Sequence, residues 1–318
     1  MNIGTIGTSL ITDRVMGQML EYDEYKYEAI YTRNESNADY LKNKYSVKKI
    51  YTNLQEMLND DEVECIYIAS PNSLHFKQAK MALESGKHVI LEKPFCTSVE
   101  ECDELIGIAK KNKCFLFEGI TTIHNPNYKE IKKIVEKLKN IKMVECNLSK
   151  YSSKYDEFLS GKTPNIFSKE FAGGALMDIN VYNIHFVVGL FGKPNHVEYI
   201  PNIKRDIDTS GVLLLNYNDF IAVCIGSKDS NGYNFCQIQA ENGVIVSKGL
   251  SSRVSNVKYC IDKDEKEFSY QDRVFAHYYY LGEIINIVKN KDYKQCFKLL
   301  QHTRDVMWVL EESDIYKK

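Results

Sequence analysis

The sequence predicts a doubly wound α/β Rossmann domain with a parallel sheet, followed by an α+β domain with a large, mainly antiparallel open sheet. Two observations lead to this prediction. Over residues 1–121, short apolar runs alternate with segments whose apolar residues recur at helical spacing. Beyond that point, strand-like runs follow one another with hairpin signals such as Asn218-Asp219 and Asn242-Gly243 between them. We therefore expect two domains, 1–121 and 122–318.

The composition is that of an ordinary globular protein. The 318 residues carry a formal net charge of −2 with Lys and Glu interspersed, so we expect no nucleic-acid or membrane partner. The nine cysteines lack CxxC or Cys/His finger spacing, which predicts reduced thiols and no metal site. No signal peptide is evident at Met1-Asn2-Ile3, and no apolar run approaches the roughly 20 residues that span a bilayer. These features predict a cytoplasmic protein.

The turn after the first apolar run, residues 2–8, has the position of a phosphate-binding loop. In such loops, small residues let the backbone approach a pyrophosphate at the amino terminus of a helix, with the fingerprint G-x-G-x-x-G. Here the letters from Gly7 to Thr12 are GTSLIT, so only the first glycine is kept. Ser9 is small and has a hydroxyl that can donate to phosphate. The alternative is an ordinary strand–helix turn.

The stretch from Cys65 to Thr97 is the most informative part of the chain. It reads CIYIASPNSLHFKQAKMALESGKHVILEKPFCT, a strand–helix–strand unit in which Lys93 follows a buried strand. Open α/β sheets bind ligands at the carboxyl ends of their strands, and burial disfavours a charged lysine that has no use. Pro94 biases the backbone of Lys93 toward extended geometry. Lys93 is therefore a candidate functional residue, and a surface turn lysine is the alternative.

The second domain contains one segment with a different pattern, FAGGALMDINVYNIH from Phe171 to His185. Its two glycines indicate a close approach. Asp178, Tyr182 and His185 are spaced i, i+4 and i+7, which predicts one shared helix face. Polar groups on an otherwise apolar helix are costly unless they face a cavity or are paired. The alternatives are a core tyrosine with a satisfied hydroxyl and a core histidine.

The segments SPNSLH, EKP and GGALMDINVY, in this order, resemble the Gfo/Idh/MocA family of nicotinamide-dependent sugar and polyol oxidoreductases. The resemblance covers the whole chain and is closest to the tyrosine subgroup, which is similar to dihydrodiol dehydrogenase and glucose–fructose oxidoreductase. It implies a cofactor domain, a substrate and oligomerisation domain, and a homodimer or homotetramer that pairs through the open sheet. GTS-x-IT is a recognisable form of the family's phosphate loop.

The resemblance also implies roles for individual residues. The implied catalytic residues are Lys93, Tyr182 and Asp178. Lys93 would lie beside the nicotinamide and the substrate hydroxyl, and Tyr182 would exchange the hydroxyl proton, its pKa lowered by Lys93. Asn180 stands where the family often has a small residue, which would narrow the pocket. His75 is either a contact or only a helix-start residue. The implied cofactor contacts are Gly7, Thr8, Ser9, Leu10, Ile11, Thr32, Arg33, Ser70, Asn72, His75, Glu92 and Lys93, and the implied substrate contacts are Lys93, Asp178, Tyr182 and His185.

The end of the second predicted strand bears on the choice of cofactor. An acid there would bind the ribose 2′-hydroxyl of NAD(H), whereas the planar fork of arginine suits the 2′-phosphate of NADP(H). This chain has Thr32-Arg33-Asn34 and no acid at the tip. We therefore expect NADP(H), with NAD(H) as second choice. The alternative makes Arg33 a surface side chain that stacks on the adenine of either cofactor.

The predicted reaction is reversible hydride transfer between C4 of the nicotinamide and a carbinol carbon of a sugar, polyol or diol. One alternative is a catalytically silent sensor or regulator of the same fold, since fold alone does not decide function. Another is a Rossmann reductase of the biliverdin or amino-acid dehydrogenase kind. The presence of both Lys93 and Tyr182 favours the polyol enzyme.

Overall fold

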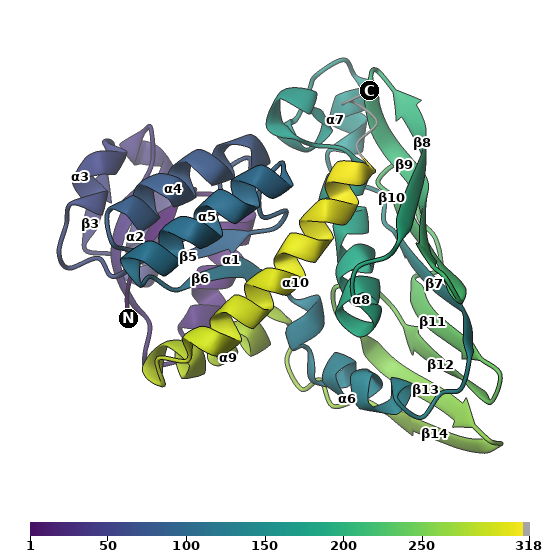
Figure 1. Cartoon of the computed structure of the whole chain (residues 1–318). Helices are drawn as coiled ribbons and strands as arrows, with labels where there is room; N and C mark the ends of the chain where they lie inside the picture. Colours follow the sequence, from purple (N-terminus) through teal and green to yellow (C-terminus); the bar gives the residue numbers. More distant parts are fainter. Residues whose placement is uncertain (314–318) are drawn as a thin grey trace. The chain divides into compact units, whose positions relative to one another are not determined.

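The computed structural model describes residues 1–313 and divides into two compact units (Figure 1). Unit 1 consists of Met1–Gly119 and Tyr280–Arg304, and unit 2 consists of Ile120–Tyr279 and, among the described residues, 305–313. This differs from the expected assignment of all of 122–318 to the second domain. The long helix α10 (Tyr293–Glu312) begins in unit 1 and ends in unit 2.

Unit 1 contains a six-stranded parallel sheet in the order β3-β2-β1-β4-β5-β6. This order confirms the predicted doubly wound sheet. Its switch point lies between β1 and β4, where dinucleotides bind in sheets of this order. The strands are β1 (Asn2–Ile6), β2 (Lys26–Tyr31), β3 (Lys49–Tyr51), β4 (Cys65–Ile68), β5 (His88–Glu92) and β6 (Leu116–Gly119). The helices that begin in the first segment are α1 (Leu10–Met19), α2 (Asp39–Tyr45), α3 (Leu54–Leu58), α4 (His75–Glu84) and α5 (Val99–Asn112).

Helix α5 begins as the sequence indicates. The side chain of Ser98 accepts a hydrogen bond from the Glu101 backbone N–H at 3.2 Å. The carboxylate of Glu101 accepts from the backbone N–H of Thr97 at 2.8 Å rather than from that of Ser98. Ser98 thus satisfies a free N–H of the first helical turn, and Glu101 satisfies the N–H of Thr97, the residue before Ser98.

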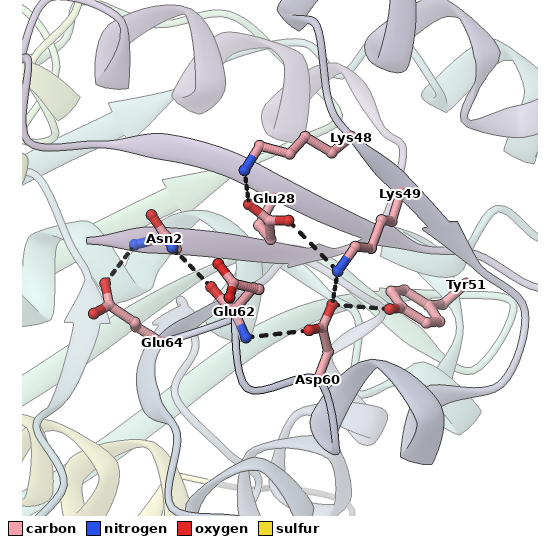
Figure 2. Close-up of polar contacts among 8 residues, drawn as sticks. All are labelled: Asn2, Glu28, Lys48, Lys49, Tyr51, Asp60, Glu62 and Glu64. Carbon is pink, nitrogen blue, oxygen red and sulfur yellow. Dashed lines mark hydrogen bonds and ion pairs between the residues drawn. The ribbon is translucent and has the colours of Figure 1, made fainter.

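One edge of the unit 1 sheet is held by a network around a buried carboxylate (Figure 2). Glu28 on β2 is 1% exposed, and its carboxylate lies 2.6 Å from Lys48 Nζ and 3.6 Å from Lys49 Nζ. Lys49 also pairs with Asp60 at 2.7 Å, and Tyr51 donates to the same Asp60 oxygen. A buried carboxylate is stable only with such partners. The network therefore ties β2 and β3 to the turn after α3.

Unit 2 contains an eight-stranded sheet in the order β14-β13-β12-β11-β7-β10-β9-β8. Neighbouring strands are antiparallel except β7 and β10, which confirms the predicted, mainly antiparallel open sheet. Asn218-Asp219 forms the β9–β10 turn, whereas the β11–β12 turn falls on Glu241-Asn242 and Gly243 begins β12. The strands are β7 (Ile141–Ser149), β8 (His196–Lys204), β9 (Ile207–Tyr217), β10 (Phe220–Ser227), β11 (Phe235–Ala240), β12 (Gly243–Lys248), β13 (Ser255–Ile261) and β14 (Asp264–Phe268).

The main core of unit 2 lies between this sheet and helix α8 (Val181–Phe191), which packs on β7 and β10 (Figure 1). Seven residues of α8 are buried, among them Phe186, Val187 and Val188. The other helices of this part are α6 (Pro126–Val135), α7 (Tyr155–Leu159) and α9 (His277–Lys289), which crosses the boundary between the units.

The segment Lys169–Phe191 has the length and composition of a membrane span, with a mean hydropathy of 1.3 over its most apolar window. The segment contains Lys169, Glu170 and Asp178, so it is not a continuous apolar run, and a buried core helix can have the same length and composition. In the structure, 61% of that window is buried, and the segment is divided into a 3₁₀ turn, a π-helical turn and α8. It serves as the core helix of unit 2, and burial against β7 and β10 accounts for its apolar letters.

Candidate active site

The predicted phosphate loop lies between β1 and α1, at the carboxyl end of a central strand. Gly7 has φ +111°, and a Cβ there would lie 2.6 Å from the carbonyl oxygen of Ala69 after β4. Ser9 is the N-cap residue of α1, and its side chain makes no capping hydrogen bond, although its Oγ lies 3.4 Å from that of Thr12. The first-turn N–H groups of α1 thus lack a side-chain cap from Ser9, which leaves a helix start suited to an anion. Thr8 is half-buried, Leu10 is 84% exposed, and Ile11 is half-buried.

The cofactor-selecting position lies at the tip of β2. Thr32 is buried and its backbone N–H donates to the carbonyl of Tyr51, which orients the following residue. Arg33 is exposed, and its side chain has no ion-pair or hydrogen-bond partner within residues 1–313. An exposed, unengaged guanidinium is compatible with both the phosphate-binding and the adenine-stacking interpretations.

The turns after β4 and β5 are joined by His75. Its Nδ1 lies 2.9 Å from the carbonyl oxygen of Pro94 and its Nε2 lies 3.0 Å from that of Ser70. The ring is buried, and burial lowers its pKa. Ser70 also donates to Gln78 at 2.6 Å, and Asn72 is half-buried at the start of the 3₁₀ turn η2 (Asn72–Leu74). These contacts favour the interpretation of His75 as a helix-start residue, which here holds the Lys93-Pro94 turn in place.

Glu92 is the last residue of β5 and is buried, whereas Lys93 follows it and is half-buried. Glu92 is 6% exposed, and its Oε1 accepts a hydrogen bond from the buried Tyr67 hydroxyl at 2.8 Å. Burial raises the pKa of Glu92 to about 7, although Tyr67 and Lys93 oppose the shift. A Cβ at Gly119 would lie 2.9 Å from this carboxyl oxygen, so the neighbouring strand needs glycine there. Glu92 therefore supports the turn from within the sheet, and Lys93 is the half-buried residue at its end.

In unit 2, the two glycines before the candidate helix do make a close approach. A Cβ at Gly173 would lie 2.7 Å from the carbonyl oxygen of Asn165, and one at Gly174 would lie 1.9 Å from Oδ1 of Asp208. The buried Asp208 accepts from the backbone N–H of Leu176 at 2.7 Å and from the Tyr199 hydroxyl at 2.8 Å. A carboxylate from β9 thus caps the helix start, where the helix dipole favours negative charge.

The helix start is a π-helical turn, η6 (Leu176–Asn180), which leads directly into α8. A π turn has more residues per turn than an α-helix, so it changes the relative direction of the side chains that follow. Asp178 and Tyr182 are both half-buried, but His185 is fully buried. The burial of His185 favours the core-histidine interpretation over a substrate contact.

Asn180 joins the start of the candidate helix to the sheet of unit 2. It is fully buried, its Nδ2 donates to the carbonyl of Cys224 at 3.1 Å, and its Oδ1 accepts from Asn183 at 2.8 Å. A Cβ at Gly226 would lie 2.8 Å from the Asn180 Cβ. Asn180 therefore fastens the helix to β10.

Sequence reasoning missed the partner of Asp178. Lys228, directly after β10, is almost fully buried, and its Nζ lies 2.8 Å from Asp178 Oδ2. The same ammonium donates to the carbonyl of Ile166 at 2.6 Å and lies 4.3 Å from the Phe167 ring centroid. In the sequence Lys228 stands in the polar string SKDSNG, which gives no signal of burial.

Two family models match most of the chain. "Oxidoreductase family, NAD-binding Rossmann fold" matches residues 1–120, and "GFO/IDH/MocA C-terminal domain" matches residues 128–246. Among the relatives, scyllo-inositol 2-dehydrogenase (NADP(+)) of Bacillus subtilis (strain 168) is 34% identical over 97% of this chain and 94% of its own length. Trans-1,2-dihydrobenzene-1,2-diol dehydrogenase of Xenopus tropicalis is 27% identical over 61% of this chain and 58% of its own length.

Solved structures share the fold at lower identity. A 3-ketoreductase from Actinomadura kijaniata in complex with NADP and TDP-benzene has a TM-score of 0.83 at 18% identity, covering 96% of this chain and 95% of its own. Biliverdin reductase from Synechocystis sp. PCC 6803, in complex with biliverdin and NADP+, has a TM-score of 0.81 at 16% identity, covering 98% of each chain. At these identities the likeness shows the fold alone, because one fold can carry different reactions. The family matches and the inositol dehydrogenase relative together show that this chain is an oxidoreductase of the Gfo/Idh/MocA family.

Proposed function

We propose that this chain is an NADP(H)-dependent dehydrogenase that interconverts a secondary hydroxyl of a cyclic polyol of the inositol class with the corresponding ketone. The observation that carries the proposal is the 34% identity with an NADP-dependent scyllo-inositol dehydrogenase over nearly the full length of both chains. The dihydrodiol dehydrogenases support the same class of secondary alcohol. The biliverdin reductase likeness gives no comparable support, since it concerns the fold alone.

The residues of unit 1 fit a nicotinamide dinucleotide. The cradle at Gly7, which a Cβ would fill, and the start of α1 suit a pyrophosphate. In this proposal the backbone from Gly7 to Ile11 holds the phosphates, and the free guanidinium of Arg33 binds the 2′-phosphate. Thr32, Ser70, Asn72 and the Glu92-Lys93 turn border the ribose and nicotinamide. When bound, NADP+ supplies the hydride acceptor at C4 of its nicotinamide.

The residues of the proposed catalytic group act on the substrate hydroxyl. Tyr182 takes the hydroxyl proton as the carbinol carbon loses its hydride, and returns it in the reverse direction. Lys93 donates a hydrogen bond to the hydroxyl oxygen, and its positive charge stabilises the phenolate form of Tyr182. Asp178 accepts a hydrogen bond from a second hydroxyl and so orients the ring. His75 and His185 have no direct part in this proposal, because both are buried.

We also propose that the protein works in the cytoplasm as a homodimer or homotetramer. In this proposal 1–121 is the cofactor domain and 122–318 is the substrate and oligomerisation domain, although Tyr280–Arg304 packs within unit 1. All nine cysteines are free thiols, as expected in a reducing compartment. The open face of the unit 2 sheet exposes Met143, Ile200 and Ile221, and exposed apolar side chains of this kind favour an interface.

The proposal is tested by titrating the purified protein with NADPH and NADH, on wild type and on Arg33→Ala, followed by an assay of scyllo-inositol oxidation with NADP+. We expect tighter NADPH binding that falls toward the NADH value in the variant, by roughly 2–3 kcal/mol for a charge-assisted phosphate contact. NADH binding of the same variant is the control and should change little. Failure to bind either cofactor would overturn the dinucleotide site, and binding without oxidation of any inositol isomer would overturn the substrate class.

A further inference from the structure

We infer that His75 is a positioning residue for the candidate catalytic lysine, because its ring joins the turn of Lys93 and Pro94 to the neighbouring turn at Ser70. The inference rests on the proposed function, since it takes the ammonium of Lys93 as the group that contacts the substrate hydroxyl. It deepens that function by naming a residue that affects turnover without contacting cofactor or substrate. All the residues concerned belong to unit 1.

The ring of His75 contacts the main chain through both of its nitrogens. Nδ1 lies 2.9 Å from the carbonyl oxygen of Pro94, and Nε2 lies 3.0 Å from that of Ser70. A neutral ring with its proton on Nδ1 donates to Pro94, and an imidazolium donates to both carbonyls. His75 is 1% exposed, and burial lowers its pKa. We therefore assign the neutral ring, with its proton on Nδ1 and its hydrogen bond to Pro94.

The turn at Ser70 has supports of its own. The Ser70 hydroxyl donates to the side chain of Gln78 at 2.6 Å. The N–H of Leu74 donates to the carbonyl of Pro71 at 2.9 Å and closes the turn. This turn is therefore a fixed point to which the ring of His75 can tie a second segment.

The Lys93-Pro94 turn is held by buried side chains at both of its ends. The N–H of Lys93 donates to the carboxyl of Glu92, which also accepts from the Tyr67 hydroxyl at 2.8 Å. Proline has no N–H, so Pro94 makes main-chain hydrogen bonds only through its carbonyl, and His75 supplies the donor there. The carboxyl and the imidazole therefore hold opposite ends of the Lys93-Pro94 dipeptide.

This arrangement predicts a loss of turnover rather than of cofactor affinity when the ring is removed. A displacement of about 1 Å in a catalytic group can cost about 100-fold in rate, because the reacting atoms no longer align. In the proposed function, the backbone of residues 7–11 and the guanidinium of Arg33 hold the phosphates of NADP(H). Removal of the His75 ring should therefore displace Lys93 and lower kcat more than it weakens NADPH binding.

The test compares three variants, His75→Leu, His75→Asn and His75→Gln, in oxidation of scyllo-inositol with NADP+ and in titration with NADPH. Leucine has no donor. The amide nitrogen of asparagine is a δ atom like Nδ1, whereas that of glutamine is an ε atom like Nε2. We expect His75→Leu to lower kcat about 10–100-fold and to change KM less than about threefold. His75→Asn should recover most of the lost turnover, and His75→Gln should recover less.

His88→Leu is the matched control. His88 begins β5, at the opposite end of the strand from Glu92, and is half-buried. Its Nδ1 accepts a hydrogen bond from the N–H of Phe115 at 3.2 Å. The substitution thus removes a bond between a ring and the main chain of the same unit, far along the strand from Lys93. It should lower the unfolding midpoint in urea and keep the wild-type kcat and KM.

Other outcomes have separate meanings. Wild-type kcat in His75→Leu, or an equal loss of kcat in His75→Leu and His88→Leu, would overturn the inference and leave the proposed function standing. Turnover in His75→Gln at or above that of His75→Asn would overturn it as well. Should His75→Leu fail to fold, the order of the asparagine and glutamine variants decides. A wild type that binds NADPH and oxidises no polyol would overturn the proposed function and this inference with it.

Discussion

The two units contain the same pair of groups, a lysine and a carboxyl, with opposite exposure. In unit 1 the carboxyl of Glu92 is buried and Lys93 is half-exposed. In unit 2 the ammonium of Lys228 is buried and Asp178 is the more exposed partner. Burial is compensated differently in each case, by a raised pKa and the Tyr67 hydroxyl for Glu92, and by a direct ion pair for Lys228. In the proposed function this difference has a use, because Lys93 of unit 1 is the hydrogen-bond donor to the substrate and Asp178 of unit 2 is the acceptor.

The largest effect is expected at Lys93, the more exposed lysine of this comparison. Lys93→Met should lower kcat for polyol oxidation by about 10²–10⁴-fold, because proton transfer in the transition state loses its charged partner. Tyr182→Phe should have an effect of similar size. The measurement is steady-state turnover, with NADPH affinity as the control that the cofactor domain remains folded. Turnover within twofold of wild type in both variants would show that Lys93 has no part in proton transfer.

A second prediction concerns the buried carboxyl of unit 1. Because the pKa of Glu92 is raised to about 7 in the folded chain from 4.5, the folded state binds more protons than the unfolded state between these values. Folding stability should therefore be highest below about pH 4.5 with respect to this group, and should fall as pH rises to about 7. The total change is about 3 kcal/mol.

Glu92→Gln should remove this decline. Its free energy of unfolding, followed by far-ultraviolet circular dichroism in urea at pH 5 and pH 8, should differ less between the two pH values than that of wild type. Glu145→Gln, on a half-buried residue of unit 2, is the matched control and should keep the wild-type slope. The same slope in wild type and Glu92→Gln would mean that Glu92 is ionised in the folded protein at both pH values.

The sequence could predict a role for the more exposed lysine of this comparison, Lys93, but it could not predict one for the buried lysine, Lys228. Lys93 was evident because an apolar run and a proline surround it, which are local signals. Lys228 was not, because its burial depends on Ile166 and Phe167, which approach it only through the tertiary fold. The glycine pair indicated a close approach to some other part of the chain. The side chain that lies there belongs to Asp208, on a strand whose register no local pattern reveals.

Two further differences have the same origin. Regular α spacing predicted one shared face for Asp178, Tyr182 and His185, but His185 is fully buried in the core, whereas Asp178 and Tyr182 are half-buried. The apolar periodicity of 275–290 and 293–312 predicted helices well, but it could not reveal that Tyr280–Arg304 belongs to unit 1. Element type follows from local spacing, whereas the partner of an element follows from packing.

The smallest predicted effect compares the helix starts of the two units. Asp208→Ala removes the carboxylate that caps η6 and that accepts hydrogen bonds from the N–H of Leu176 and the hydroxyl of Tyr199, which should cost about 2 kcal/mol. Ser98→Ala removes one local capping bond of α5 and should cost about 1 kcal/mol. The single tryptophan, Trp308, belongs to unit 2 and lies 4.2 Å from Lys193 Nζ at its ring centroid. Tryptophan fluorescence in urea should therefore report the Asp208→Ala loss in full and the Ser98→Ala loss only if the units unfold together. Equal midpoints for Asp208→Ala and wild type would show that the buried carboxylate does not stabilise the start of the candidate catalytic helix.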